Sequence, residues 1–143
     1  MILQSAAFTH EGEIPAKYSC KGRNVSPPLR IQNVPPTARS LVLICEDPDA
    51  PGRTFQHWLS WDIDPGTSEI PEATEPGTPG QNDFGKAQYG GPCPPSGTHR
   101  YYFRLYALDT TLGLPKGAAR RDLDRAMQDH VLAEAELMGT FPA

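Results

Sequence analysis

Three segments of the chain have the hydrophobic pattern of β-strands. Residues 40–45 form a short apolar run with polar ends, which is typical of a central strand. Residues 57–63 alternate between apolar and polar positions, which predicts one face carrying Leu59, Trp61 and Ile63. Residues 100–108 alternate as well, with one face predicted to carry Tyr101, Phe103, Leu105 and Ala107. The period of two predicts a sheet that turns one face toward a core.

One segment has the pattern of a helix. Residues 120–138 contain no proline or glycine, and a stripe recurs there at helical spacing, formed by Leu123, Ala126, Met127, His130, Val131 and Ala135. Gly139 is a suitable stop after this stripe. We therefore expect a C-terminal amphipathic helix that packs its stripe on the core.

The remaining segments are typical of turns and loops. Residues 24–28 and 33–37 have the composition of turns, and residues 66–88, rich in Gly, Pro, Thr and Glu, predict one long surface loop. No repeat and no linker divides the chain. The pattern predicts a single domain over residues 1–143, mostly β, built as an antiparallel β-sandwich with a C-terminal α-helix.

Each apolar row predicted on the strands ends in a polar residue. The apolar row on residues 40–45 continues to Asp47. The row on residues 57–63, followed toward the N-terminus, ends at His57. The row of the third strand leads back through Tyr101 to His99. Alternation keeps these side chains on the core side, so the row ends line one recess if they meet in space. A carboxylate beside two imidazoles would favour their charged or correctly oriented forms.

The loop before the third strand is dense in glycine and proline. Residues 89–97 contain three glycines and three prolines around Cys93. Glycine lets a backbone approach a ligand closely, and proline stiffens the loop. Backbone N–H groups and imidazoles together suit an anion. The sequence therefore predicts a small preformed pocket for a phosphate or a carboxylate.

Each of these residues alone also has an ordinary structural explanation. Asp47 suits an Asx-turn, His57 a solvated strand end, and Tyr101 the core. An alternative from another class is a small metal-dependent hydrolase that uses the same Asp/His cluster. The chain has no H-E-x-x-H pair, so we favour binding without turnover, with no catalytic residue, no metal and no cofactor.

Composition narrows the range of partners and compartments. The net charge of -4 and the absence of a basic cluster argue against nucleic acid as a partner. No apolar run approaches the roughly 20 residues of a membrane-spanning helix, and no signal peptide follows Met1, so we expect a cytoplasmic location. The three cysteines, at positions 20, 45 and 93, form no C-x-x-C motif. We expect free thiols, with a Cys20–Cys45 bridge left open.

Three motifs of the chain resemble those of a known family. They are Asp-Pro-Asp-Ala-Pro at 47–51, His-Trp-Leu at 57–59, and Tyr-Gly-Gly-Pro-Cys-Pro-Pro-Ser-Gly-Thr-His-Arg-Tyr at 89–101. Together with residues 20–29 and 102–109, they are similar to the phosphatidylethanolamine-binding proteins, also called Raf kinase inhibitor-like proteins. The similarity is greatest to the short bacterial and archaeal branch of that family.

The resemblance implies a β-sandwich with an anion pocket at one end. It implies these ligand-binding residues: Asp47, His57, Gly90, Gly91, Pro92, His99 and Tyr101. The implied ligands are phosphate, phosphorylethanolamine-type groups or carboxylates. Family members described as inhibitors imply a serine-protease or kinase partner, or a signalling role, and the resemblance is compatible with a homodimer. Two departures from the branch pattern, Glu46 and Ile63-Asp64-Pro65, touch none of these positions.

Overall fold

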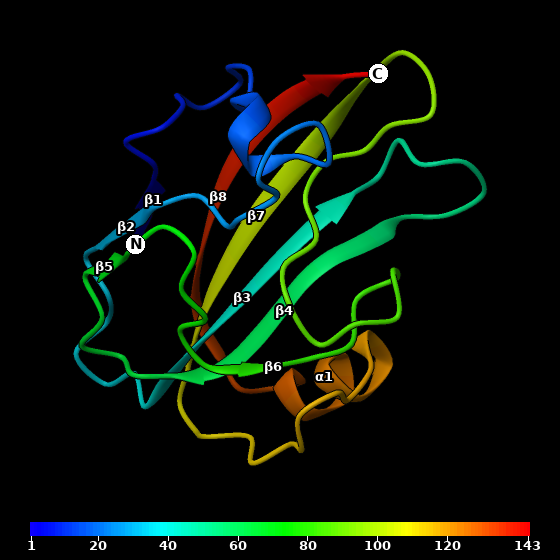
Figure 1. The fold of residues 1–143 in the computed structure, drawn as a ribbon. Coiled ribbons are helices and arrows are strands. Elements are labelled where there is room, and N and C mark those ends of the chain that lie inside the picture. The colour runs from blue at the N-terminus through cyan, green and yellow to red at the C-terminus, as the bar shows by residue number, and fades with distance from the viewer.

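The computed structural model describes all 143 residues and consists mainly of two antiparallel β-sheets (Figure 1). The smaller sheet has the strand order β1-β2-β5, and the larger has the order β6-β4-β3-β7-β8. The strands are β1 (Ile2–Gln4), β2 (Leu29–Gln32), β3 (Ser40–Asp47), β4 (Phe55–Ile63), β5 (Glu69–Ile70), β6 (Thr78–Pro79), β7 (Thr98–Leu108) and β8 (Val131–Pro142). The helices are the short 3-10 helix η1 (Ala16–Tyr18) and α1 (Arg120–Met127).

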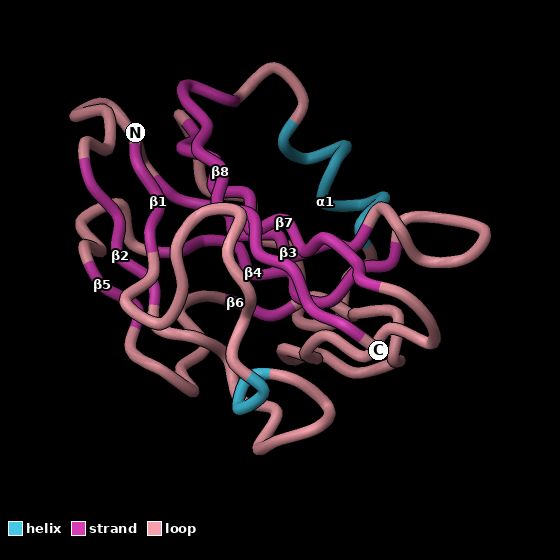
Figure 2. The backbone as a smooth tube through the Cα atoms, turned by 90° about the horizontal axis from the view of Figure 1, so that it is seen from above, coloured by secondary structure: helices cyan, strands magenta, loops and turns pink.

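The elements are stacked in layers, with the larger sheet in the middle. The smaller sheet lies on one side of it and α1 lies on the other (Figure 2). The main core fills the space between the sheets and includes Leu41, Leu43, Cys45, Tyr101, Phe103, Leu105 and Ala107. A second core joins the larger sheet to α1 through Val42, Ile44, Leu59, Trp61, Leu108, Leu123 and Met127. Burial of apolar side chains on both faces of the larger sheet stabilises this arrangement.

The predicted fold class is confirmed, but the predicted extent of the helix was wrong. The helix ends at Met127, and Asp129 has a positive φ of 67°, which a continuing helix does not allow. From Val131 the chain forms β8, which pairs with β7 along its length. The ladder and the core contacts of β8 override the helical spacing of its first residues. Neither helix is long and apolar enough to cross a membrane.

Gly139 is part of this strand and does not stop a helix. A Cβ atom at this position would lie 2.5 Å from Ile14 Cγ1 and 2.8 Å from Phe8 Cε2, both closer than real contacts. The missing side chain lets residues 8–14 pack directly on β8. The N–H of Ile14 donates to the Thr140 carbonyl at 2.8 Å, which holds this covering segment in place.

Strand β4 contains two irregularities that the alternating pattern did not reveal. Its register against β3 shifts at two points, and Asp62, near one of them, has a positive φ of 54°. A β-bulge places two successive residues on the same side of a sheet. Leu59 and Trp61 therefore pack against α1, whereas Ile63 packs between the sheets. The prediction that these three side chains share one face was wrong.

The segment predicted as one long surface loop, residues 66–88, is partly built into the sheets. It contains β5, which pairs with β2, and β6, which pairs with β4. Asn82 is buried within it, and its Oδ1 accepts hydrogen bonds from the N–H groups of Phe84 and Lys86. This turn fixes the position of Phe84 near the start of β4.

The cysteines are also arranged differently from the expectation of free thiols. Cys20 and Cys93 form a disulfide, with their Cα atoms 5.5 Å apart. Cys45 is the free cysteine and is buried in the main core, so the Cys20–Cys45 bridge is not formed. The pairing depends on two loops that lie far apart in the sequence, and spacing alone does not show that they meet.

Candidate functional site

A small cavity lies where β3 ends and where β4 and β7 begin. It has a volume of about 300 Å³ and is lined by Asp47, Ala50, Pro51, Phe55, His57, Phe84, Cys93, Pro94, Pro95, His99 and Tyr101. The loops before β4 and β7 enclose it, in the upper right part of Figure 1. The structure thus brings together four residues predicted from the row ends: Asp47, His57, His99 and Tyr101.

Asp47 and His99 form a buried pair between the neighbouring strands β3 and β7. The distance from His99 Nδ1 to Asp47 Oδ2 is 2.6 Å, and the two residues are only 7 % and 3 % exposed. Asp47 Oδ1 also accepts the N–H of Asp49 at 2.8 Å, so the Asx-turn expected as an alternative is present as well. A carboxylate at Nδ1 keeps a proton there and fixes the ring, which leaves Nε2 as the nitrogen available to a ligand.

His57 reaches the cavity because of a β-bulge. Its neighbours Gln56 and Trp58 pair with successive residues of β3, which leaves His57 as the extra residue. Its Nδ1 lies 2.7 Å from the carbonyl oxygen of Gly90. Because a carbonyl only accepts hydrogen bonds, Nδ1 carries the proton. Burial lowers the pKa of His57, so near neutral pH the ring is uncharged and its Nε2 is an acceptor.

Tyr101 supplies an unpaired donor to the same cavity. Its residue is 1 % exposed, and its hydroxyl has no hydrogen-bond partner in the protein. Burial raises the pKa of Tyr101, with a further contribution from the charge of Asp47, so the hydroxyl keeps its proton. The ring stands edge-on to His57, with centroids 5.2 Å apart, and is stacked with His99 at 6.5 Å. A buried unpaired hydroxyl is unusual in a folded protein and marks a place where a ligand can bond.

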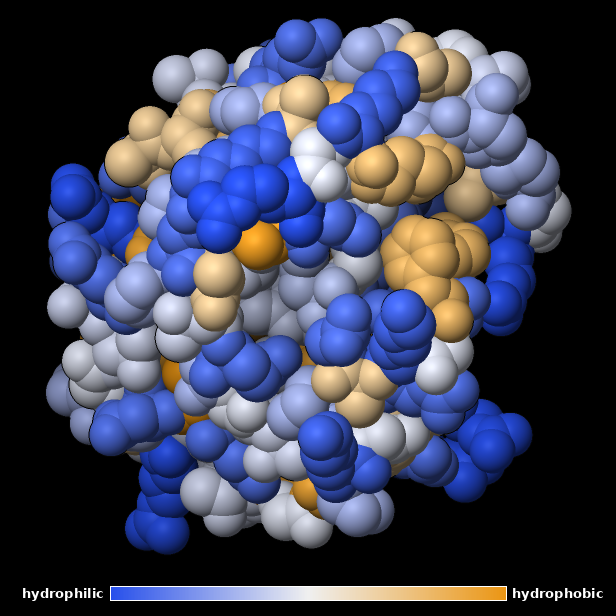
Figure 3. Space-filling view, in the orientation of Figure 1, coloured by the Kyte–Doolittle hydropathy of each residue, from blue (hydrophilic) through white to orange (hydrophobic).

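An apolar rim surrounds these polar atoms. Phe55 and Phe84 pack edge to face with ring centroids 4.8 Å apart, and Phe84 is 46 % exposed. The face seen in Figure 3 is mostly hydrophilic, and a prominent apolar group lies on its right side, beside the β3–β4 loop of Figure 1. Sequence reasoning missed Phe55 and Phe84. The one available signal was Phe84, the single aromatic residue within segment 66–88.

Gly90, Gly91 and Pro92 do not line the cavity. The N–H of Gly90 donates to the His57 carbonyl at 3.0 Å, and that of Gly91 donates to Asn24 Oδ1 at 2.8 Å. These amides are therefore engaged within the protein, contrary to the expectation that glycine amides face the anion. Gly90 is bonded to His57, and Cys93, Pro94 and Pro95 form the wall instead.

The charged residues near the cavity are paired with one another. Arg100 forms hydrogen bonds with both carboxylate oxygens of Asp49 at 2.8–2.9 Å, and these lower the pKa of Asp49 to about 2. Glu46, the first departure from the branch pattern, points to the α1 side and binds Arg104 and Arg120. It is thus placed away from the cavity.

The cavity does not offer a set of metal ligands. No three His, Cys, Asp or Glu side chains in the protein lie close enough together to hold a metal ion. The alternative of a metal-dependent hydrolase therefore finds no donor set in this cluster.

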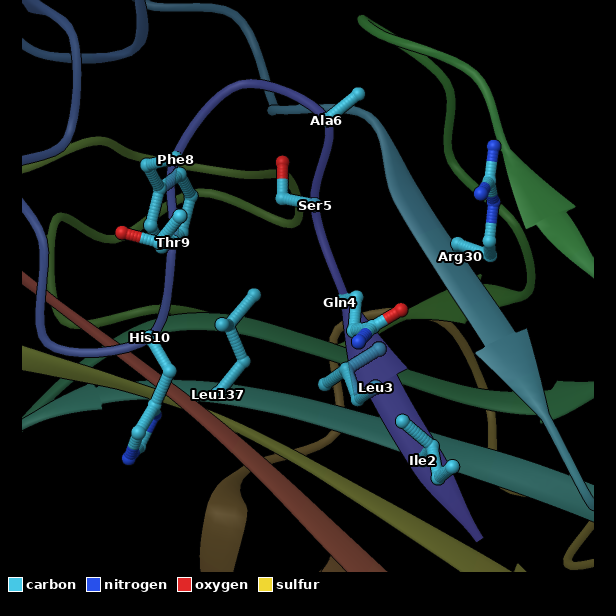
Figure 4. Close-up of a pocket in the computed structure, with 10 residues that line it drawn as sticks. All are labelled: Ile2, Leu3, Gln4, Ser5, Ala6, Phe8, Thr9, His10, Arg30 and Leu137. Carbon is cyan, nitrogen blue, oxygen red and sulfur yellow. The ribbon is translucent and has the colours of Figure 1, made fainter.

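A second cavity is larger than the one lined by His57 and His99, but its polar side chains lie apart from one another. It lies between β1 and β8, has a volume of about 430 Å³, and is lined by Ile2, Leu3, Gln4, Ser5, Ala6, Phe8, Thr9, His10, Arg30 and Leu137 (Figure 4). Figure 4 shows His10 and Arg30 at opposite ends of this second cavity, with Leu3 and Leu137 between them. Because its polar groups do not converge, the smaller cavity is the better candidate site.

The fold and the cavity define a class: a small two-sheet β-sandwich protein with a histidine-lined cavity at one end of its larger sheet. A profile of the phosphatidylethanolamine-binding protein family matches residues 4–142, and the chain belongs to this family.

The chain is similar to archaeal and bacterial proteins. A UPF0098 protein from Methanothermobacter thermautotrophicus is 48 % identical over 99 % of this chain and 98 % of its own length. The crystal structure of a putative phosphatidylethanolamine-binding protein homolog, CT736 from Chlamydia trachomatis, has a TM-score of 0.96 at 42 % identity, covering 99 % of this chain and 97 % of that one. E. coli YbcL, described as a new member of the mammalian PEBP family, has a TM-score of 0.91 at 27 % identity with the same coverage. These matches confirm the resemblance to the bacterial and archaeal branch.

Proposed function

We propose that the cavity binds one small oxyanion, a phosphoryl group or a carboxylate, without turning it over. The observation that carries this proposal is the buried, unpaired hydroxyl of Tyr101, whose ring packs against the imidazoles of His57 and His99. A volume of about 300 Å³ suits a headgroup-sized molecule, and the apolar rim excludes water from the bonds made inside. The relatives include a putative phosphatidylethanolamine-binding protein homolog, and that name agrees with a ligand of this class.

The arrangement of protons favours a ligand that carries a proton of its own. Tyr101 offers a donor, whereas neutral His57 offers an acceptor at Nε2, because its Nδ1 proton is used by Gly90. A singly protonated phosphate or phosphate monoester matches both, since its P–O accepts from Tyr101 and its P–OH donates to His57. Alternatively, a fully ionised group binds when His57 takes up a proton. In both cases one proton enters the site together with the anion.

The side chains of the cavity favour binding over catalysis. The sulfur of Cys93 is held in the disulfide with Cys20, so it provides no thiolate nucleophile. The hydroxyl of Tyr101 has a raised pKa and is a poor nucleophile. The proposal is therefore a protein that is not an enzyme and has no catalytic residue. No feature of the cavity favours a protease or kinase over a free anion, so the small anion is the ligand that we propose.

Calorimetry at two pH values tests the proposal. Phosphate and phosphorylethanolamine should bind more tightly near pH 6 than near pH 8, because each bound anion brings or requires a proton. The direction of this pH dependence follows from His57. Because burial lowers its pKa, protonation of this ring costs more free energy at pH 8 than at pH 6. Equal affinity at both pH values, or no binding at either, contradicts the proposal.

The variant Tyr101→Phe keeps the ring and removes only the hydroxyl. We expect phosphate affinity to fall by about tenfold, which corresponds to the loss of one hydrogen bond to a charged group. The variant Tyr102→Phe is the matched control, because Tyr102 is half-buried and does not line the cavity. If both variants bind as the unmodified protein does, the hydroxyl of Tyr101 has no part in binding.

A further inference from the structure

The part of the cavity-wall loop before Cys93 is held to a distant loop by hydrogen bonds. Three bonds join residues 18–24 to residues 89–92: Tyr89 Oη donates to the Tyr18 carbonyl at 2.7 Å, the Gly91 N–H to Asn24 Oδ1 at 2.8 Å, and the Cys20 N–H to the Pro92 carbonyl at 3.1 Å. The loop residues that make these bonds precede Cys93, Pro94 and Pro95, the residues of this loop that line the cavity. The bonds therefore fix the base of the loop and leave its wall residues to be held by something else.

The disulfide is the covalent link that joins the wall residues to a distant part of the chain. No hydrogen bond between backbone atoms joins residues 93–96 to the rest of the protein, and two of them are prolines, which have no N–H to donate. The next fixed point is Gly97, whose carbonyl accepts the N–H of Ala143 at 2.8 Å and whose φ is 68°. The segment from Cys93 to Gly97 is thus a stiff span anchored by Cys20 at one end and by a glycine at the other.

This anchor is accessible to reagents in solution. Both disulfide-bonded residues, Cys20 and Cys93, are exposed, whereas the remaining cysteine, Cys45, is buried. A thiolate attacks an accessible disulfide sulfur through a mixed disulfide. With a dithiol as reductant, the S–S bond of the protein breaks, Cys20 and Cys93 become thiols, and the dithiol closes to its own disulfide. Two electrons and two protons pass from the dithiol to the protein.

We propose that the Cys20–Cys93 disulfide is a redox-sensitive control of the cavity: the oxidised protein holds the wall in its binding position, and reduction by a dithiol releases it. This inference rests on the proposed function, because its readout is the binding of an anion. Cys93, Pro94 and Pro95 line the cavity together with His57, His99 and Tyr101. When the span is released, water enters the site and the bonds made by Tyr101 and the imidazoles weaken.

The expected loss of phosphate affinity depends on the fraction of reduced molecules in which the wall stays in its binding position. If reduction leaves the wall in place in about one tenth of the molecules, the apparent Kd for phosphate rises about tenfold. The three hydrogen bonds at the base of the loop remain, so the sheets and the rest of the cavity keep their positions.

Phosphate calorimetry on oxidised and reduced protein tests this inference. Dithiothreitol is a suitable reductant because it is uncharged and does not compete for an anion site. Titration of free thiols confirms that reduction is complete, and near-ultraviolet circular dichroism checks that the core is folded. The double variant Cys20→Ser/Cys93→Ser, measured without reductant, mimics the released state. The variant Cys45→Ala is the matched control, because it also loses a cysteine but keeps the disulfide.

We expect about tenfold weaker binding for the reduced protein and for the double variant, and we expect Cys45→Ala to respond to dithiothreitol as the unmodified protein does. The inference is overturned if oxidised and reduced protein bind phosphate equally, or if reduction abolishes binding only by unfolding the core. If the oxidised protein itself binds no phosphate, the proposed function fails first and the inference fails with it.

Discussion

The chain contains two histidine–aspartate pairs with nearly the same geometry and very different surroundings. His99 Nδ1 lies 2.6 Å from Asp47 Oδ2 at the cavity, and His130 Nδ1 lies 2.7 Å from Asp109 Oδ1, where β7 ends and β8 begins. The side chains of the first pair are 9 % and 4 % exposed, whereas those of the second are 43 % and 47 % exposed. The same contact therefore exists once in the interior and once in water.

The difference shows that geometry alone does not make a site. In water, a pair at this distance is screened and contributes little to stability. In the interior, removal of one partner leaves the other desolvated and unpaired, which is costly. The buried pair also has a use that the exposed pair lacks, because His99 shares a cavity with His57 and Tyr101.

Removal of the carboxylate should give the largest difference in the free energy of unfolding between the two pairs. Asp47→Ala should lower the free energy of unfolding by about 3 kcal/mol, because it strands a buried imidazole and the N–H of Asp49. Asp109→Ala should lower it by at most about 0.5 kcal/mol. Urea unfolding of both variants measures the difference. Similar losses for the two would show that burial does not distinguish the pairs.

Replacement of the histidines should separate binding from stability. In His99→Gln, the amide can still donate to Asp47, but the ring nitrogen that faces a ligand is lost. We expect the affinity for phosphate to fall by about tenfold, the loss of one charge-assisted bond. His130→Gln should leave affinity unchanged. The idea that His99 contacts the ligand fails if both variants bind phosphate equally well, and His99 is mainly structural if its variant unfolds.

The sequence predicted those parts of the fold in which alternation is regular. The rows of β3 and β7 were correct, because both strands keep a period of two up to Asp47 and His99. In β4, His57 was placed at the cavity for the wrong reason. The predicted row of Leu59, Trp61 and Ile63 does not exist, and a bulge turns His57 toward the cavity. Bulges depend on pairing between strands, which a single strand's pattern does not contain.

The helix error has a similar cause. Residues 120–138 fit helical spacing, yet residues 133–141 also alternate with small or apolar residues at every second position. Pairing with β7 decides between the two, and that pairing is a contact between distant segments. The disulfide and the apolar rim of Phe55 and Phe84 likewise depend on loops that meet only in the folded chain.

The central claim, that an anion binds between the two buried imidazoles, is tested most directly by NMR of the histidine rings during a phosphate titration. The chain has four histidines, and His10 and His130 are exposed internal controls outside the cavity. We predict that the ring resonances of His57 and His99 shift together with one saturating curve, and that those of His10 and His130 shift only weakly. If all four rings respond alike, or if His57 and His99 do not respond, the claim is contradicted.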